Sequence, residues 1–374
     1  MKRAEIKPFY DFILIDEGQD FPSGFYELAF ALSENDRDRK NIIWAYDELQ
    51  NILNVRIRSP QELFGNDVDG KPRIDLERSH KNLPPGVAND IVLSKCYRNQ
   101  REVLVTAHAL GFGIYGEIVQ LLQNEDHWTD VGYEVASGRM EIGKKIRIFR
   151  PEENSPLSLR SKDQDRIIDY AHFATARAEI SWVSDSTETF IQQGLKPEDI
   201  LIICLDDRYA RSYFKSLSEK LAAKKIQTNN IIADPYREPS FLIEGKVTLS
   251  TVYRAKGNEA AVVFAVGIDG IDSRTRAGRN KLFTAFTRSK AWLRVSGVGK
   301  GAKKFCDEIA LAEKKFPYLE FVMPDPVEIE TIQRDLSERS IKAKKLKDEY
   351  INKLRKIGLS DEEITEILSG EERT

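Results

Sequence analysis

The chain has 374 residues, of which 41% are hydrophobic and 31% are charged, and its formal net charge is −3. This length accommodates two domains of ordinary size, each with its own hydrophobic core. No run of eighteen apolar residues occurs, so we expect no membrane span, and the N-terminal residues lack the apolar segment of a signal peptide. A net charge this small neither requires nor excludes that the protein binds nucleic acid.

Cysteine usage indicates the compartment. Cys96, Cys204 and Cys306 lie far apart, without the spacing of a metal site or of a disulfide framework. We therefore predict a protein of the reducing cytoplasm.

The first informative segment is an acidic turn after an apolar run. Residues 10–15 read as a buried strand, and Asp16, Glu17 and Gln19 follow at its C-terminal tip. Open parallel sheets place their ligand sites at this end of their strands. One carboxylate there can hold Mg²⁺ and its neighbour can orient an attacking water, although a solvated loop has the same composition.

A second strand, residues 42–46, also ends in acidic residues. Asp47 follows it directly, and Gln50 comes three residues later. A glutamine beside the first acidic tip can bond a γ-phosphate or its attacking water. The same residues also occur in ordinary turns.

Tyr97 and Arg98 precede a helix-like stretch over residues 102–109. A tyrosine ring can stack on a base, and the adjacent guanidinium can bind a phosphate with two hydrogen bonds. An isolated pair of this kind more often lies on the surface or packs in the core, so the neighbouring segments decide whether it binds a ligand.

Two later segments combine strands with basic residues. Residues 248–261 read as a strand, a polar loop and the start of another strand, which suits contact with phosphate oxygens. Arg288 ends an apolar helix-like segment within residues 282–290. A guanidinium in that position can stabilise the charge that develops during phosphoryl transfer.

Strand-like runs alternate with helical patterns beyond residue 94, which predicts an α/β domain with a parallel sheet. We expect three parts: residues 1–93, residues 94–322 and a helical tail over residues 323–374. In the tail, apolar residues at three- and four-residue steps predict one long amphipathic helix over 327–357, and a capping pattern at Ser360 predicts a short last helix. The long helix packs either on the chain itself or on a partner helix.

Taken in order, the five segments resemble the UvrD/Rep-like superfamily 1 helicases. The acidic turn resembles motif II of that family, residues 47–50 motif III, and the Tyr-Arg pair motif IV. Residues 248–261 resemble motif V and residues 282–290 motif VI. The resemblance implies part of one RecA-like domain followed by a second RecA-like domain of the P-loop NTPase type, with a parallel sheet.

The resemblance assigns the acidic half of an ATP site to the first part of the chain. Asp16 would bind Mg²⁺, and Glu17 would be the general base for the attacking water. Gln19 and Gln50 would contact the γ-phosphate side and couple it to motion.

It assigns the other half to the second part. Tyr97 would stack on adenine and Glu259 would reach the ribose, while Arg98 and Arg288 would contact the γ-phosphate. Thr251, Tyr253 and Lys256 would lie along single-stranded DNA. A run of ten basic residues without an acidic one, within residues 274–304, could add contacts to the phosphate backbone.

One family feature is absent. No GxxxxGK[ST] loop (Walker A) occurs in the sequence, and only fifteen residues precede Asp16. We therefore expect the C-terminal part of an ATP-dependent DNA helicase or translocase, inactive alone, whose missing N-terminal region comes in cis or from a partner protein. The alternatives are a non-catalytic subunit that completes a split helicase, and a nucleic-acid-binding protein that has lost ATPase activity.

Overall fold

The computed structural model divides the chain into two compact units. One comprises residues 1–47, 55–91 and 333–374, and the other comprises residues 48–54 and 92–332. The residues described are 6–34, 40–50, 59–76, 83–84, 89–122, 124–157, 159, 166–234, 236, 239–325, 329–332, 350–351 and 354–355. The division predicted from the sequence, at residues 93 and 322, stays a prediction.

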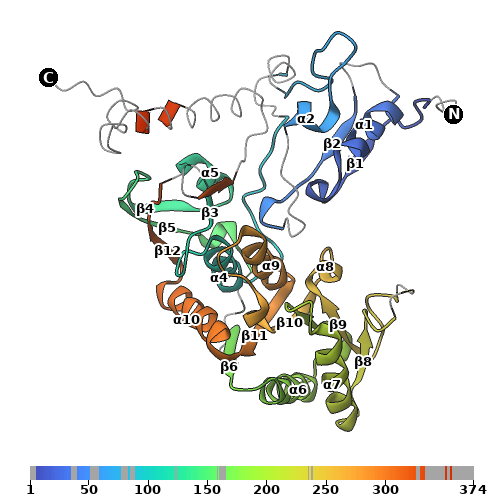
Figure 1. The fold of residues 1–374 in the computed structure, drawn as a ribbon, viewed down its shortest axis with the longest axis vertical. Helices are drawn as coiled ribbons and strands as arrows, with labels where there is room; N and C mark the ends of the chain where they lie inside the picture. The colour runs from blue at the N-terminus through green and yellow to red at the C-terminus, as the bar shows by residue number, and fades with distance from the viewer. Residues whose placement is uncertain are drawn as a thin grey trace. The chain divides into compact units, whose positions relative to one another are not determined.

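Among its described residues, the first unit has a parallel pair of strands, β1 (Ile13–Ile15) and β2 (Ile42–Trp44), and the helices α1 (Ser23–Leu32) and α2 (Pro60–Phe64) (Figure 1). Tyr26 of α1 and Phe64 of α2 are almost fully buried, and their rings meet edge to face. Ser59 and Glu62 form a reciprocal capping box at the start of α2. This small core fixes where β1 and β2 end.

The second unit is built on a six-stranded sheet in which all neighbouring strands are parallel. The strand order is β6-β11-β10-β7-β9-β8. The strands are β6 (Ile168–Phe173), β7 (Ile200–Cys204), β8 (Gln227–Asn230), β9 (Lys246–Thr251), β10 (Ala260–Val266) and β11 (Ser289–Val298). This mixed α/β architecture is the one expected for a RecA-like domain.

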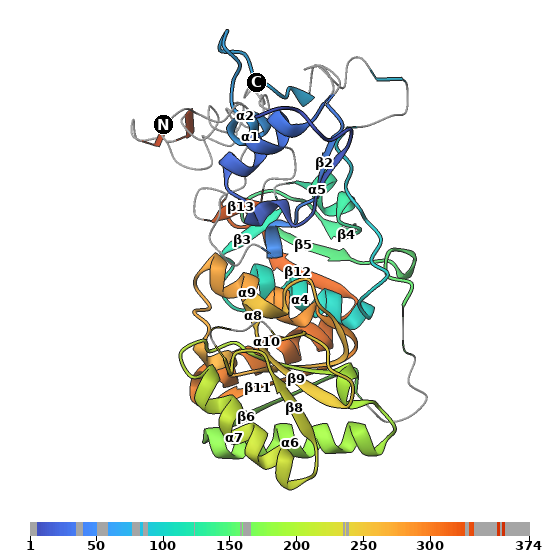
Figure 2. The same ribbon diagram turned by 90° about the vertical axis from the view of Figure 1, so that its right-hand side faces the viewer.

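Helices cover both faces of this sheet (Figure 2), which parallel sheets require because both of their faces are apolar. The helices are α4 (Arg101–Phe112), α6 (Ala176–Gln192), α7 (Ala210–Ala223), α9 (Arg276–Phe286) and α10 (Gly299–Lys315). Along β7, Leu201 and Ile203 join the core under α4, α9 and α10, whereas Ile200 and Ile202 join the core under α6 and α7. Side chains that alternate between two apolar layers explain why the strand reads as a continuous hydrophobic run.

Shorter elements surround the end of α4. They are β3 (Gln120–Leu122), α5 (Glu125–Asp130), β4 (Glu134–Gly138), β5 (Lys145–Phe149), β12 (Tyr318–Val322) and β13 (Glu330–Ile332). β12, β5 and β4 form an antiparallel sheet, and β13 pairs with β3. Residues 330–332 are thus a strand, where the apolar pattern had predicted the start of a long helix. The rest of the predicted tail helices lies almost wholly outside the described residues.

In the part of the chain that the structure describes, no helix is both long enough and apolar enough to cross a membrane.

Glu179 of α6 is a buried carboxyl group. Its Oε1 accepts hydrogen bonds from the backbone N–H of Gly267 at 3.0 Å and from the Ser296 hydroxyl at 2.8 Å. Burial, the largest cause, raises the pKa of Glu179 above its usual value. The folded state therefore holds this proton more tightly than the unfolded chain does.

We expect Glu179→Gln to change how stability depends on pH. A raised folded-state pKa contributes stability that is complete below the unfolded pKa of about 4.3 and is lost as pH rises through the folded value. The amide retains an acceptor and does not titrate, so the variant should gain stability relative to the wild type between acidic and neutral pH. Urea unfolding from pH 4.5 to 8 measures this difference, and a trend of the opposite sign would contradict the argument.

Candidate functional site

The acidic turn follows β1 directly in the first unit. Asp16 is exposed, and its Oδ1 accepts a hydrogen bond from the backbone N–H of Glu17 at 2.8 Å. Glu17 has a φ of 51°, in the left-handed region. A side chain other than glycine held there costs about 1–3 kcal/mol, a strain often found at functional sites.

Gln19 joins the tips of the two strands of this unit. Its side chain is buried, its Nε2 donates to Glu17 Oε2 at 2.5 Å, and its Oε1 accepts from the Asp47 backbone N–H at 3.0 Å. A Cβ at Gly18 would lie 2.5 Å from the Tyr26 hydroxyl, so the turn tolerates only glycine there without a shift. The structure thus brings the acidic turn and Asp47 together, whereas the placement of Gln50 beside this turn stays a prediction.

Asp16 is the residue predicted to hold Mg²⁺. Within the described ranges, no group of three or more His, Cys, Asp or Glu side chains is arranged to hold a metal ion. One exposed carboxylate suits an ion that takes its remaining ligands from water and phosphate, as Mg²⁺ commonly does. The Mg²⁺ site stays a prediction.

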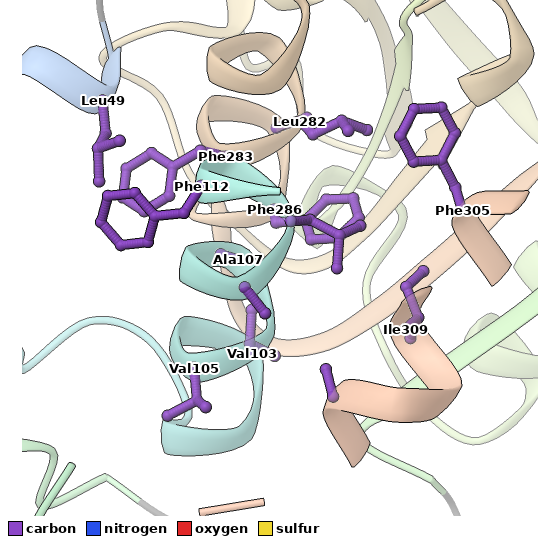
Figure 3. Close-up of a cluster of buried hydrophobic side chains, with 14 of the residues drawn as sticks. Leu49, Val103, Val105, Ala107, Phe112, Leu282, Phe283, Phe286, Phe305 and Ile309 are labelled. Carbon is purple, nitrogen blue, oxygen red and sulfur yellow. The ribbon is translucent and has the colours of Figure 1, made fainter. Parts of the chain in front are cut away.

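Gln50 and Arg288 form a hydrogen bond in the second unit. Arg288 is almost fully buried just after α9; its Nη2 donates to Gln50 Oε1 at 2.6 Å, and its Nε donates to the Thr284 carbonyl at 3.1 Å. Leu49, in the 3-10 helix η3 (Glu48–Gln50), lies beside Phe112 and Phe283 in the core (Figure 3). This packing holds Gln50 on the arginine.

Arg98 and Lys290 share the carboxylate of Glu259. Lys290 Nζ lies 2.7 Å from Glu259 Oε1, and Arg98 Nε lies 4.0 Å from Glu259 Oε2, which is too long for a direct hydrogen bond. Arg98 Nε is buried without a hydrogen-bond partner among the residues described. The neighbouring Tyr97 is 67% exposed, so its ring is accessible to a ligand.

Strand order explains this convergence. Glu259 precedes β10 and Arg288 precedes β11. Because the two strands are parallel neighbours, both residues lie at the same end of the sheet, where these strands begin. The backbone N–H of Ala260 donates to the Arg288 carbonyl at 3.1 Å. Asn99 and Gln100 then tie the turn that carries Arg98 to the start of β11. Sequence reasoning missed both of these amides, whose only signal was their position beside the Tyr-Arg pair.

The residues predicted to touch DNA begin at the opposite end of the sheet, where the strands finish. Thr251 ends β9, and Tyr253 lies in the short helix α8 (Val252–Ala255) that follows it, whereas Lys256 comes directly after α8. Tyr253 is 39% exposed, with the Lys281 ammonium 4.9 Å from its ring centroid. An exposed ring with a cation beside it suits the stacking of a base.

The basic run over residues 274–304 does not form one continuous face. Arg279 and Arg288 are buried, and Lys281 is paired with Asp207 at 2.6 Å. Lys303 is likewise paired with Asp307. The run crosses a helix, a strand and a second helix, so its side chains point into different layers. The structure therefore gives little support to a single phosphate-binding surface along this run.

Part of the second unit matches a known protein family. Residues 246–296 match the family model of the UvrD-like helicase C-terminal domain. The chain is similar to the C-terminal part of UvrD-like helicases. The matched segment contains Thr251, Tyr253, Lys256, Glu259 and Arg288.

Among solved structures, the chain is similar to the C-terminal domain of a possible DNA helicase from Lactobacillus plantarum. The two are 17% identical with a TM-score of 0.30, and the similarity covers 38% of this chain and 80% of the other. No curated protein matches the chain.

Proposed function

We propose that this chain is the C-terminal part of an ATP-dependent superfamily 1 DNA helicase or translocase. The family match supports a helicase-related role and an interaction with nucleic acid. The observation that carries the finer proposal is the convergence of Arg98, Glu259 and Arg288 at the end of a parallel sheet where its strands begin. Gln50 is hydrogen-bonded to Arg288 there. This arrangement suits one face of a triphosphate site.

In the proposed reaction, Arg98 and Arg288 contact the γ-phosphate and stabilise the charge that develops on it. Tyr97 stacks on adenine, and the Glu259 carboxylate, which holds Lys290 at 2.7 Å, bonds the ribose. The Tyr97 and Glu259 side chains are exposed, whereas Arg288 is buried.

The resemblance assigns the remaining groups to the acidic turn. Asp16 holds Mg²⁺, which neutralises charge on the phosphate oxygens when bound. Glu17 accepts a proton from the attacking water, and Gln19 fixes the orientation of the Glu17 carboxylate through the 2.5 Å hydrogen bond. Gln50, held on Arg288, contacts the γ-phosphate side and links hydrolysis to movement.

Thr251, Tyr253 and Lys256 contact single-stranded DNA, and ATP hydrolysis moves the protein along it. The three free cysteines favour the reducing cytoplasm as its location. The phosphate-cradling Walker A loop has to come from a region outside this sequence, in cis or from a partner protein, because no GxxxxGK[ST] occurs here.

We expect the purified chain to hydrolyse no Mg-ATP above background, with or without single-stranded DNA. Without the cradling loop, nothing in the sequence holds the β- and γ-phosphates against the acidic turn. A coupled phosphate-release assay measures this, with Glu17→Gln as the control. Robust hydrolysis by the wild type that Glu17→Gln abolishes would contradict the need for a supplied loop.

The source of the loop is settled by the reading frame upstream of the codon for Met1. An in-frame extension that contains GxxxxGK[ST] supports one long helicase chain. A separate neighbouring gene that encodes the loop supports a split enzyme.

A further inference from the structure

Asn99 occupies an unusual position between the two arginines of the proposed site. It follows Arg98 in the chain, and its side chain is buried, with 1% of its surface exposed. Its Nδ2 donates to the carbonyl of Thr287 at 2.9 Å and to the carbonyl of Ser289 at 2.7 Å. One amide group therefore holds the residues on both sides of Arg288.

The orientation of this amide is fixed from its other end. The Cys96 thiol lies 3.6 Å from Asn99 Oδ1, as a weak donor to that oxygen. This contact leaves the NH₂ group to face the two carbonyls, which require donors. Neither a carboxylate nor an apolar side chain at this position could satisfy both carbonyls.

Two further side chains hold the turn that carries Arg98. Gln100 Nε2 donates to the Lys290 carbonyl at 2.8 Å, and Arg150 Nη2 donates to the Ser94 carbonyl at 2.8 Å. Neither contact reaches a residue adjacent to Arg288. The only described side chain that joins the backbone next to Arg98 to the backbone on both sides of Arg288 is therefore that of Asn99.

We infer that Asn99 is a positioning residue that fixes the spacing of Arg98 and Arg288. This inference rests on the proposed function, in which both guanidinium groups contact one γ-phosphate. A misplacement of about 1 Å in such a group can cost about 100-fold in rate. Asn99 itself, enclosed by backbone, does not touch the phosphate.

The test compares Asn99→Ala with a matched control. Asn229 is also buried, and its Nδ2 donates to two consecutive carbonyls, those of Ser240 at 2.9 Å and Phe241 at 3.0 Å, in another part of the same unit. Asn229→Ala therefore removes the same chemistry away from the arginines. Asn99→Asp keeps the shape of the side chain but removes its N–H donors. If Asn99→Ala does not fold, Asn99→Ser replaces it in the test, because serine keeps one donor.

The first readout is the arginine Nε–Hε NMR spectrum of the full chain without nucleotide. Asn99→Ala and Asn99→Asp should shift the Arg98 and Arg288 signals and speed the exchange of the Arg288 Hε, whereas Asn229→Ala should leave both unchanged. Unchanged Arg98 and Arg288 signals in the Asn99 variants overturn the inference, whatever the chain does with ATP.

The second readout is kinetic, in the assembly that contains the Walker A loop. Asn99→Ala should lower kcat by about 100-fold and change KM for ATP by less than about threefold. A kcat that falls equally in Asn229→Ala overturns the positioning role. If the wild-type assembly hydrolyses no ATP, the proposed function fails, and the NMR result alone decides whether Asn99 holds the arginines.

Discussion

Replacement of Arg288 by alanine should lower kcat for ATP hydrolysis by about 10³–10⁵-fold in the assembly that contains the Walker A loop. The guanidinium is held before the reaction by the Thr284 carbonyl and by Gln50, so little reorganisation is needed when charge develops on the phosphate. Arg288→Lys should restore little activity, because an ammonium lacks the planar fork that binds two phosphate oxygens.

The matched control is Arg147→Ala. Arg147 lies on β5, its guanidinium is 3.7 Å from the ring centroid of Tyr318, and its side chain is 44% exposed. Its removal deletes a cation of the same type without touching the proposed site. Steady-state hydrolysis with saturating single-stranded DNA gives kcat for each variant. An Arg288→Ala enzyme within tenfold of the wild type would exclude a catalytic role for this arginine.

Breaking the buried ion pair of Arg279 and Glu308 should cost about 3–5 kcal/mol of unfolding free energy. Arg279 Nη1 lies 2.5 Å from Glu308 Oε2 and Nη2 lies 3.2 Å from Oε1, and the two side chains are 0% and 3% exposed. Nε also donates to the Ser273 carbonyl at 2.8 Å. Removal of one partner leaves the other charge in a medium that solvates it poorly.

Four variants separate the charge effect from packing. Arg279→Leu and Glu308→Leu should each be strongly destabilised, whereas the double variant should recover much of the loss because no buried charge remains. Lys303→Ala, which breaks the exposed pair with Asp307, should change stability by less than about 1 kcal/mol. Urea unfolding gives each free energy. Single variants as stable as Lys303→Ala would show that the pair is not buried in solution.

Strands β7, β9, β10 and β11 of the second unit were predictable because their sequence signal is local. An apolar run over residues 200–204 coincides with β7, and another over residues 262–266 lies within β10 (Ala260–Val266). Residues packed between two helical layers must be apolar on both faces, which leaves an uninterrupted run in the sequence. The acidic turn was predictable for a related reason, since it marks where such a run meets solvent.

Contacts between distant segments were not predictable. Asn99 bonds residues 188 and 190 positions away, and Gln100 also bonds a residue 190 positions away. Which amide meets which carbonyl depends on strand order, because β10 and β11 are neighbours and bring the residues that precede them to the same end of the sheet. The burial of Glu179 and Arg279 was also missed, because each carries a charge that hydrophobic periodicity assigns to the surface.

The prediction of a long tail helix failed at residues 330–332. These residues pair with β3 in strand β13. A short apolar segment with three-residue spacing fits either state, and the neighbouring strand decides between them.

The most direct test of the central claim is a titration with Mg-ATP of the assembly that contains the Walker A loop, followed by the Nε–Hε NMR signals of the arginines of this chain. If Arg98 and Arg288 form one face of a triphosphate site, their signals should move together along one binding curve, while the signal of Arg147 stays in place. Signals of Arg98 and Arg288 that remain unchanged while nucleotide shifts arginines elsewhere would contradict the account.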